Sequence, residues 1–595
     1  MPLSDVGSAD RPARAAALAV AILLLAGLAV VDGDLAGSAP RAWLPLALRG
    51  AMLATGLALA AFGLAGGREG RAGDWTRGEV ALVLALTGAA FAIRAWRLDA
   101  LRVLIDEGNS IDTLFHAYRP DTPLLLPPNV YVTTMLYPAW QALVVAVAGP
   151  TLSAFRLSSA LLGALTVPAL WLLARELFGR PTALAAAVVL AGFAPHVHFS
   201  RVGLPHIADA LFGTAALAGI ARGLNGGRLA WALGGIALGL THYGFEAGRW
   251  FFTPLVVVWL VMLRLLAPER LRGAGPGVAR LVVASLLTLV PLCGALLGSG
   301  GDIAPRLRAS SLDGREAAAL LADPRALGAR LALAAGAYVS QPEQQRYYGG
   351  DDSLLTPLLA PFALLGAALS IARPRAPALL IPLWLVAAWL ANAVMREPLV
   401  FARWVVAFPA LALATARGAS AVGGWLGGAR TERRAALATV VLAALLSLAQ
   451  LHRYFGTHLE PLAEQARADK PYRDAIDAAL RAASLLPRGD VLVISEPLVD
   501  VHPPRSLLRL LRAGGDDLRL EVAAPSAVDA GYLAALPGDR DHAFFVAPDD
   551  AATVARLGGC FALDGPQPSP YPVAPEKRLD LYLARVGSRR ASCGS

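Results

Sequence analysis

Long apolar stretches constrain the fold of this chain more than any other feature. A helix that crosses a membrane needs about 20 mostly apolar residues. Hydrophobic residues make up 56% of the 595-residue chain and charged residues only 16%, against about 25% in soluble domains. We therefore predict an all-α polytopic membrane protein with about 13 transmembrane helices. The predicted spans are residues 15–31, 43–65, 79–96, 154–173, 181–199, 206–222, 229–245, 250–266, 280–298, 354–372, 377–394, 399–417 and 435–452.

The distribution of arginine predicts the orientation of these spans. A further apolar stretch, residues 131–149, contains Tyr137, Trp140 and Gln141, and we interpret it as an amphipathic segment lying on the membrane surface. With that interpretation, the arginine-bearing turns fall in the cytoplasm, as the positive-inside rule expects. These turns are residues 66–78, 174–180, 222–228, 264–280, 373–376 and 417–434. The net charge of +9 is then an orientation signal, with the N-terminus inside and the C-terminus outside.

The spans divide the chain into three predicted parts. Two helices occupy residues 1–78, and a transmembrane domain occupies residues 79–452, with large outer loops at 97–153 and 299–353. Residues 453–595 have the composition of a small soluble domain outside the membrane. Segments with helical periodicity alternate there with short apolar strands, which predicts a three-layer α/β domain. Its cysteines, Cys560 and Cys593, pair or stay free; the spacing does not decide between these alternatives.

Ionisable residues gather at the predicted outer ends of the spans, where they are costly and usually functional. Asp106 and Glu107 begin the first outer loop, although a solvated loop would also carry such a pair. Arg201, Arg249 and Arg403 lie at later outer boundaries. Arginine binds phosphate well, so these three are candidate phosphate-binding residues. The alternative is that each reaches to lipid headgroups on its own.

Further polar residues flank these arginines. His206 and Asp209 are three residues apart and share one helix face. His242 and Tyr243 precede Arg249 at the next outer boundary. The histidine spacing matches no zinc signature, and a divalent metal is left open.

The order of these motifs resembles the GT-C superfamily of integral-membrane glycosyltransferases. It is most similar to the branch that includes protein O-mannosyltransferases and the aminoarabinose transferases of lipid A. The resemblance covers residues 79–260 well and 354–417 loosely, and residues 1–78 precede it. His206 stands where many members have an aspartate, and Asp209 follows one turn later. The matching motifs are Asp106-Glu107, Arg156-Leu157-Ser158-Ser159, Ser200-Arg201, His242-Tyr243 through Arg249 to Pro254, and Arg403 to Pro409.

The resemblance implies a polyprenyl-phosphate sugar as donor and a lipid, glycan or protein as acceptor, on the outer face of a bacterial cytoplasmic membrane. We expect Asp106 to be the base that deprotonates the acceptor, with Glu107 orienting it, in a single inverting displacement. The donor phosphate would bind the three arginines. The predicted substrate-binding residues are His206, Asp209, His242, Tyr243, Arg346 and Tyr347. The last two lie in a loop that either closes over the sugar or is a plain surface loop.

Other functions remain open from the sequence. An outer-leaflet polysaccharide polymerase or ligase would share substrates and sidedness. A multi-pass transporter would show internal repeats and charges at mid-membrane, which we do not find. A non-catalytic sensor would use the tail for binding. No motif predicts nucleic-acid binding.

Overall fold

The computed structural model describes most of the chain in two compact units. The first comprises Met1–Leu98, His116–Gln141 and Arg156–Leu459, and the second comprises Asp99–Phe115, Ala142–Phe155 and Glu460–Ser595. We describe each unit separately. The described residues are 10–35, 44–65, 75–100, 105–116, 125, 134–299, 304–345, 347–372, 376–427, 432–459, 475–486, 488–496, 502–513, 517–570 and 578–593.

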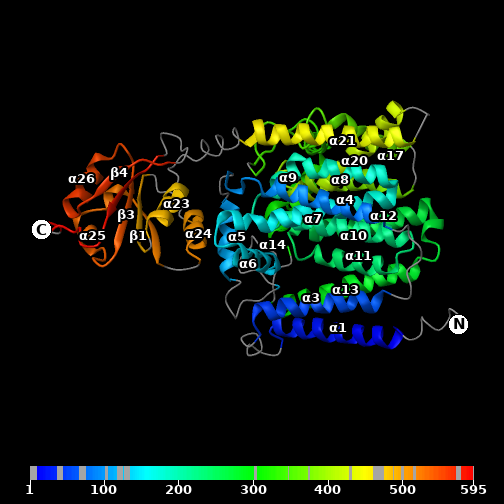
Figure 1. The fold of residues 1–595 in the computed structure, drawn as a ribbon, viewed down its shortest axis with the longest axis horizontal. Helices are drawn as coiled ribbons and strands as arrows, with labels where there is room; N and C mark the ends of the chain where they lie inside the picture. The colour runs from blue at the N-terminus through cyan, green and yellow to red at the C-terminus, as the bar shows by residue number, and fades with distance from the viewer. Residues whose placement is uncertain are drawn as a thin grey trace. The chain divides into compact units, whose positions relative to one another are not determined.

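Apolar helices make up the first unit, and its long helices run side by side (Figure 1). Nine helical segments of the described chain are long and apolar enough to cross a membrane. The long helices are α1 (Asp10–Asp32), α3 (Leu46–Leu64), α4 (Arg77–Ala95), α7 (Leu152–Phe178), α10 (His206–Leu224), α12 (Glu246–Leu266), α13 (Gly275–Ser299), α20 (Phe408–Gly427) and α21 (Glu432–Arg453).

Shorter helices complete the set. The apolar ones are α8 (Arg180–Gly192), α11 (Arg228–Leu240), α17 (Ala360–Ala372) and α18 (Leu380–Ala393), together with α6 (Leu136–Ala148), whose residues from Ala142 on belong to the second unit. Between them lie α9 (Ala194–Phe199), α14 (Pro305–Ser310), α15 (Gly314–Ala322), α16 (Pro324–Gly336) and α19 (Phe401–Trp404). Each of the thirteen predicted spans overlaps one or more of these helices. The predicted class, a mostly helical multi-span membrane protein, is confirmed.

Small residues let the helices of this unit approach closely, as is usual where lipid removes the hydrophobic drive for association. A Cβ atom added to Gly366 of α17 would lie 1.9 Å from the carbonyl oxygen of Ala414, and one added to Gly418 of α20 would lie 2.0 Å from that of Phe362. Only glycine therefore permits this α17–α20 contact. Nearby, Trp384 and Trp404 are fully buried and fill the wider gaps of the core.

The second unit contains a five-stranded sheet with the order β2-β1-β3-β5-β4. β1 pairs in parallel with β2 and β3, whereas β5 pairs antiparallel with β3 and β4. The strands are β1 (Gly489–Ile494), β2 (Leu518–Ala523), β3 (Asp541–Val546), β4 (Asp564–Gln567) and β5 (Asp580–Ala584). Period-two burial explains the layers: alternate residues of β1 and β3 face opposite apolar cores.

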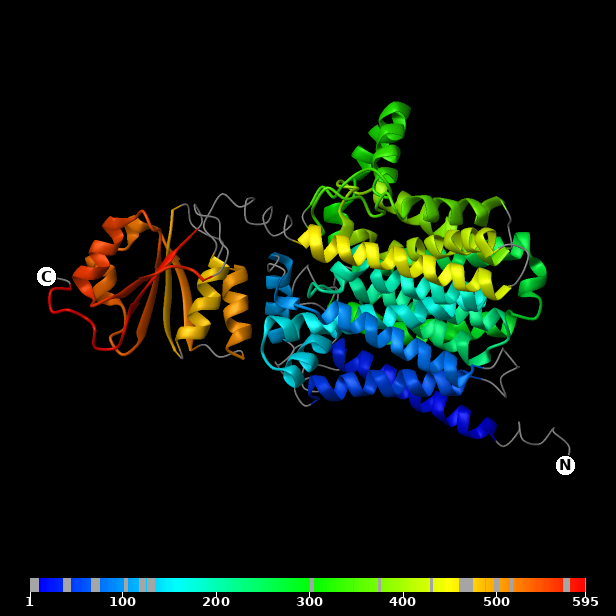
Figure 2. The ribbon, with the colours of Figure 1, turned by 45° about the horizontal axis from the view of Figure 1, so that its top comes forward.

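Helices cover both faces of this sheet (Figure 2). α23 (Ala475–Leu485) and α24 (His502–Leu511) pack on one face, and α25 (Ala530–Ala535) and α26 (Ala551–Cys560) on the other. The predicted three-layer α/β domain is confirmed. Cys560 and Cys593 form a disulfide, which selects the paired alternative and fastens the end of the chain to α26.

Candidate functional site

Two adjoining cavities lie in the first unit, among the ends of α10, α12, α14, α18 and α19. The apolar pocket presents mostly hydrophobic side chains and is lined by Phe245, Glu246, Ala247, Trp250, Phe251, Arg306, Leu307, Ser310, Ala391, Asn392, Met395, Arg403 and Val406. The polar pocket has a volume of about 190 Å³ and is lined by His206, Phe245, Arg306, Gln345, Tyr347, Glu397, Val400, Ala402 and Arg403.

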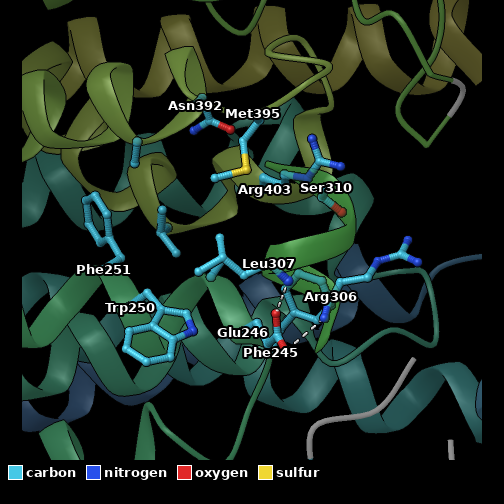
Figure 3. A pocket seen from close by; sticks show the side chains of 13 residues that line it. Phe245, Glu246, Trp250, Phe251, Arg306, Leu307, Ser310, Asn392, Met395 and Arg403 are labelled. Atoms are coloured by element: carbon cyan, nitrogen blue, oxygen red, sulfur yellow. Dashed lines mark hydrogen bonds between the residues drawn. The ribbon is translucent and has the colours of Figure 1, made fainter. Parts of the chain in front are cut away.

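The two pockets share Phe245, Arg306 and Arg403. Figure 3 shows Trp250 and Phe251 at one side of the apolar pocket and the two arginines at the other. The guanidinium groups of Arg306 and Arg403 therefore lie at the boundary between the apolar pocket and the polar pocket. An amphiphilic anion would fit this arrangement, with its charged group between the arginines and its hydrocarbon along the aromatic side.

A buried carboxylate fixes the start of α12. Asp209, in the first turn of α10, accepts hydrogen bonds from the backbone N–H groups of Phe245 (2.8 Å) and Gly248 (2.7 Å). These are donors that a helix N-terminus leaves without internal partners. A Cβ atom added to Gly248 would lie 2.5–2.8 Å from the carboxylate atoms, so glycine is needed for this close approach. Asp209 thus acts as a helix cap here and does not line either pocket.

The next carboxylate along, Glu246, positions α14. It accepts hydrogen bonds from the backbone N–H groups of Arg306 (3.2 Å) and Leu307 (2.5 Å), as Figure 3 shows. Two short connections, from α10 to α12 and from α12 to α14, thereby place the side chain of Arg306 at the junction of the pockets. No sequence signal marks Arg306, which follows a proline in a long loop and belongs to no motif.

His206 gives the polar pocket an unsatisfied polar atom. Its ring stacks on Phe245, with centroids 3.9 Å apart, and the residue is 7% exposed. No group in the described part of the chain forms a hydrogen bond with its Nδ1 atom. Buried polar groups are usually satisfied, and an exception often marks a ligand site. Arg403 lies in the same pocket and donates from Nη1 to the carbonyl oxygen of Glu397 (2.9 Å).

A folded segment, residues 343–345 and 347–352, contributes Gln345 and Tyr347 to another wall of the polar pocket. The carboxylate of Glu343 accepts hydrogen bonds from the N–H groups of Tyr348 (2.6 Å), Gly349 (3.0 Å) and Phe401 (2.7 Å). Burial raises the pKa of Glu343 to about 8, although these hydrogen bonds oppose the rise. Glu343 therefore holds this segment against the start of α19.

Further contacts hold this segment in place. Gln345 donates to the Glu397 carboxylate (2.8 Å), and His198 Nε2 donates to the carbonyl oxygen of Tyr347 (2.6 Å). The predicted substrate-binding residue Tyr347 does line the polar pocket. Arg346, its predicted partner, lies outside the described residues.

Other predicted site residues support helix ends instead. The Arg201 guanidinium donates to carbonyl oxygens at the end of α4, among them that of Arg97 (2.9 Å). Arg249 donates to the carbonyl oxygen of His242 (2.8 Å), and the Tyr243 hydroxyl donates to that of Thr288 (2.6 Å). These contacts lie within the first unit, and none of the four predicted residues lines the two pockets. The side-chain donors of Arg201, Arg249 and Tyr243 therefore bind backbone carbonyl oxygens, where the sequence predicts a phosphate or a substrate.

The predicted acid pair lies in the second unit, at the start of α5 (Ile105–His116). Glu107 is buried and Asp106 is half-buried. The same helix contacts α24 of the sheet domain: the Ser506 hydroxyl donates to the Asp112 carboxylate (2.8 Å). The Arg509 guanidinium also lies 4.5 Å from the centroid of the Phe115 ring. Within its own unit, the helix that carries the predicted base is therefore attached to the C-terminal domain.

The described residues contain no group of three or more His, Cys, Asp or Glu side chains that could hold a metal ion.

Part of the chain matches a known family. Residues 132–291 match the family model described as dolichyl-phosphate-mannose-protein mannosyltransferase. The match covers less than half of the chain. The predicted resemblance to GT-C glycosyltransferases, and the predicted enzyme class, are thereby confirmed. The match includes α10, α11, α12 and most of α13, with Asp209 and Glu246, and ends before Arg306. No curated protein matches the sequence.

The chain is also similar to solved structures at low sequence identity. The structure of ArnT from Cupriavidus metallidurans in the apo state matches with a TM-score of 0.50 and 14% identity, covering 85% of this chain and 98% of that one. The undecaprenyl-phosphate-bound structure of ArnT gives 0.48 and 15%, covering 86% and 98%. The archaeal oligosaccharyltransferase AglB from Archaeoglobus fulgidus, in complex with an inhibitory peptide and a dolichol-phosphate, gives 0.42 and 15%, covering 73% and 64%.

Proposed function

We propose that this chain transfers a sugar from a polyprenyl-phosphate donor to a lipid, glycan or protein acceptor on the outer face of the bacterial cytoplasmic membrane. One observation carries the proposal: an apolar and a polar pocket meet at Arg306 and Arg403. A polyprenyl-phosphate sugar has a matching arrangement of apolar and polar parts, because its phosphate lies between an apolar chain and a polar sugar. Solved structures of similar proteins with bound undecaprenyl phosphate or dolichol-phosphate agree with this donor class.

In this proposal the donor lies across the junction. Its phosphate binds Arg306 and Arg403, its first isoprene units lie along Trp250 and Phe251, and its sugar enters the polar pocket. The unsatisfied Nδ1 atom of His206 is then available to a sugar hydroxyl. The phosphate contacts predicted for Arg201 and Arg249 remain predictions, as do substrate contacts of His242, Tyr243 and Asp209.

The chemistry is a single displacement. The acceptor hydroxyl attacks the anomeric carbon as the bond from that carbon to the phosphate oxygen breaks, which inverts the centre. Asp106 takes the hydroxyl proton, and Glu107 orients the acceptor. The lipid phosphate leaves with the bonding electrons, and the two arginines stabilise its added negative charge.

The proposal is tested with purified protein in lipid nanodiscs and a radiolabelled polyprenyl-phosphate sugar. Arg306→Gln and Arg403→Gln each remove hydrogen bonds to a charged group, worth about 1.5–3 kcal/mol. We therefore expect kcat/KM for the donor to fall about 10–150-fold in each variant. Asp106→Asn should abolish transfer while expression and thermal stability stay unchanged.

A matched control is Arg325→Gln, since Arg325 is an exposed arginine of α16, away from the pockets. It should keep wild-type kinetics. Wild-type transfer by Asp106→Asn would contradict its role as base, and unchanged donor kinetics in both pocket variants would overturn the donor site.

A further inference from the structure

A third cavity lies at the opposite ends of the helices that form the candidate site. It is bounded by the turn from α10 to α11 and by the turn from α12 to α13, and it has a volume of about 520 Å³. α10 has 19 residues and so spans about 28 Å, close to the thickness of a hydrocarbon core. The cavity and the candidate site therefore face opposite membrane surfaces. We call it the arginine cavity.

Four arginines line this cavity: Arg228, Arg270, Arg272 and Arg280. None of the residues that line it is acidic, and Glu269, although next to Arg270 in sequence, is not part of the lining. Within the described chain, the four guanidinium groups have neither an ion pair nor a hydrogen-bond acceptor. Arg222, just outside, differs: it pairs with Glu176 at 2.9 Å. Arg228, Arg270 and Arg272 are exposed and Arg280 is half-buried, so water hydrates them when the cavity is empty, and four like charges around one cavity attract an anion.

The cavity is built around a buried tryptophan. Trp231 is 4% exposed and lines the cavity, and its indole N–H has no acceptor among the described groups. A Cβ atom added to Gly223 would lie 2.6 Å from this ring, and one added to Gly277 would lie 2.4 Å from its Nε1 atom. Both glycines are therefore required by the close packing of the indole. The wall is a specific structure rather than a chance gap between loops.

We propose that the arginine cavity binds phosphate groups of an anionic phospholipid headgroup, and a headgroup with two phosphates more tightly than one with a single phosphate. Its volume far exceeds the 10–15 Å³ or so that one water molecule requires, so it accommodates a group of this size. The arginine distribution predicts that this end of the helices is cytoplasmic, where anionic lipids attract basic pockets between transmembrane helices. A lipid reaches this position directly from the inner leaflet.

The test measures binding to the full-length purified protein by native mass spectrometry and by thermal shift, without any donor or turnover. The probes are cardiolipin, with two phosphates, phosphatidylglycerol, with one, and phosphatidylcholine, which has no net charge. The variant is Arg270→Gln with Arg272→Gln. At roughly 1 kcal/mol for each basic residue near the membrane surface, we expect cardiolipin binding to weaken about 30-fold in the double variant.

A double variant with the same charge change is the control. Arg264→Gln with Arg433→Gln removes two exposed arginines that the sequence places on the same side and that do not line the cavity. It should retain cardiolipin binding. Equal weakening in both double variants would show attraction to the general surface charge and overturn the site. Equal thermal stability of the two without added lipid establishes that both fold.

A soluble ion is the other source of phosphate. Inorganic phosphate and pyrophosphate are therefore tested on the same proteins. Cardiolipin binding that persists in millimolar pyrophosphate supports the lipid. Saturable pyrophosphate binding that displaces cardiolipin and depends on Arg270 and Arg272 would overturn the lipid assignment. These results are separate from the proposed transferase activity, because none of them depends on sugar transfer.

Discussion

Replacing Glu246 with alanine tests how the fold positions Arg306. The Glu246 carboxylate accepts the backbone N–H groups of Arg306 and Leu307, and removing it leaves both donors without their charged acceptor. Each such bond is worth about 1.5–3 kcal/mol, so about 3–6 kcal/mol of local stability is lost. α14 has only six residues, so its displacement would move Arg306 away from the pocket junction without unfolding the chain.

The expected result is a higher KM for the polyprenyl-phosphate donor. The effect on KM is limited by the contact between Arg306 and the donor phosphate, which is worth about 1.5–3 kcal/mol, a factor of about 10–150. We therefore expect Glu246→Ala to raise the donor KM between about 10-fold and 150-fold, measured with radiolabelled donor in nanodiscs. Glu246→Gln keeps one acceptor oxygen and should show a smaller increase.

A control is available in the same loop. Asp313 caps α15 by accepting the N–H groups of Arg315 and Glu316 (2.9 Å each), but it is exposed and away from the pockets. Asp313→Ala should leave the donor KM unchanged. The reasoning fails if Glu246→Ala keeps the wild-type KM, or if Asp313→Ala raises it as much.

Three further predictions concern other contacts. The raised pKa of Glu343, about 8 against an ordinary 4.5, means that its contribution to stability is full below pH 4.5 and lost as pH rises through 8. Thermal unfolding temperatures should fall over this range in the wild type and change less in Glu343→Gln; parallel pH profiles would contradict this. Replacing Ser506 and Arg509 with alanine removes two contacts between α24 and α5, so kcat should fall about tenfold while the donor KM stays constant. A changed KM with constant kcat would refute it. Gly248→Ala forces a Cβ atom against the carboxylate that caps α12 and should cost about 1–3 kcal/mol in thermal stability, unlike Gly50→Ala, where nothing lies within 4 Å. Equal stability of the two variants would argue against the close approach.

The sequence determined the elements of this fold because their signals are local. Each predicted span rests on a run of apolar residues that lipid selects for, and each overlaps a helix. The sheet domain followed from short apolar strands that alternate with amphipathic helices. The motifs around Ser200 and Arg249 were also sufficient to indicate the glycosyltransferase class, as the match of residues 132–291 confirms.

Only the tertiary structure decided what individual polar residues contact. The sequence placed Arg201 and Asp209 at a membrane boundary, where a phosphate, a substrate or a backbone group could equally be the partner. Packing brought the ends of α4 and α12 beside them, and the unpaired backbone groups of those helix ends bind the two side chains. Arg306 is the converse case: it has no motif, but the carboxylate of Glu246, distant in sequence, holds its backbone and places it at the pocket junction. Hydrophobic periodicity depends on neighbours along the chain, whereas a polar side chain takes the partner that folding brings to it.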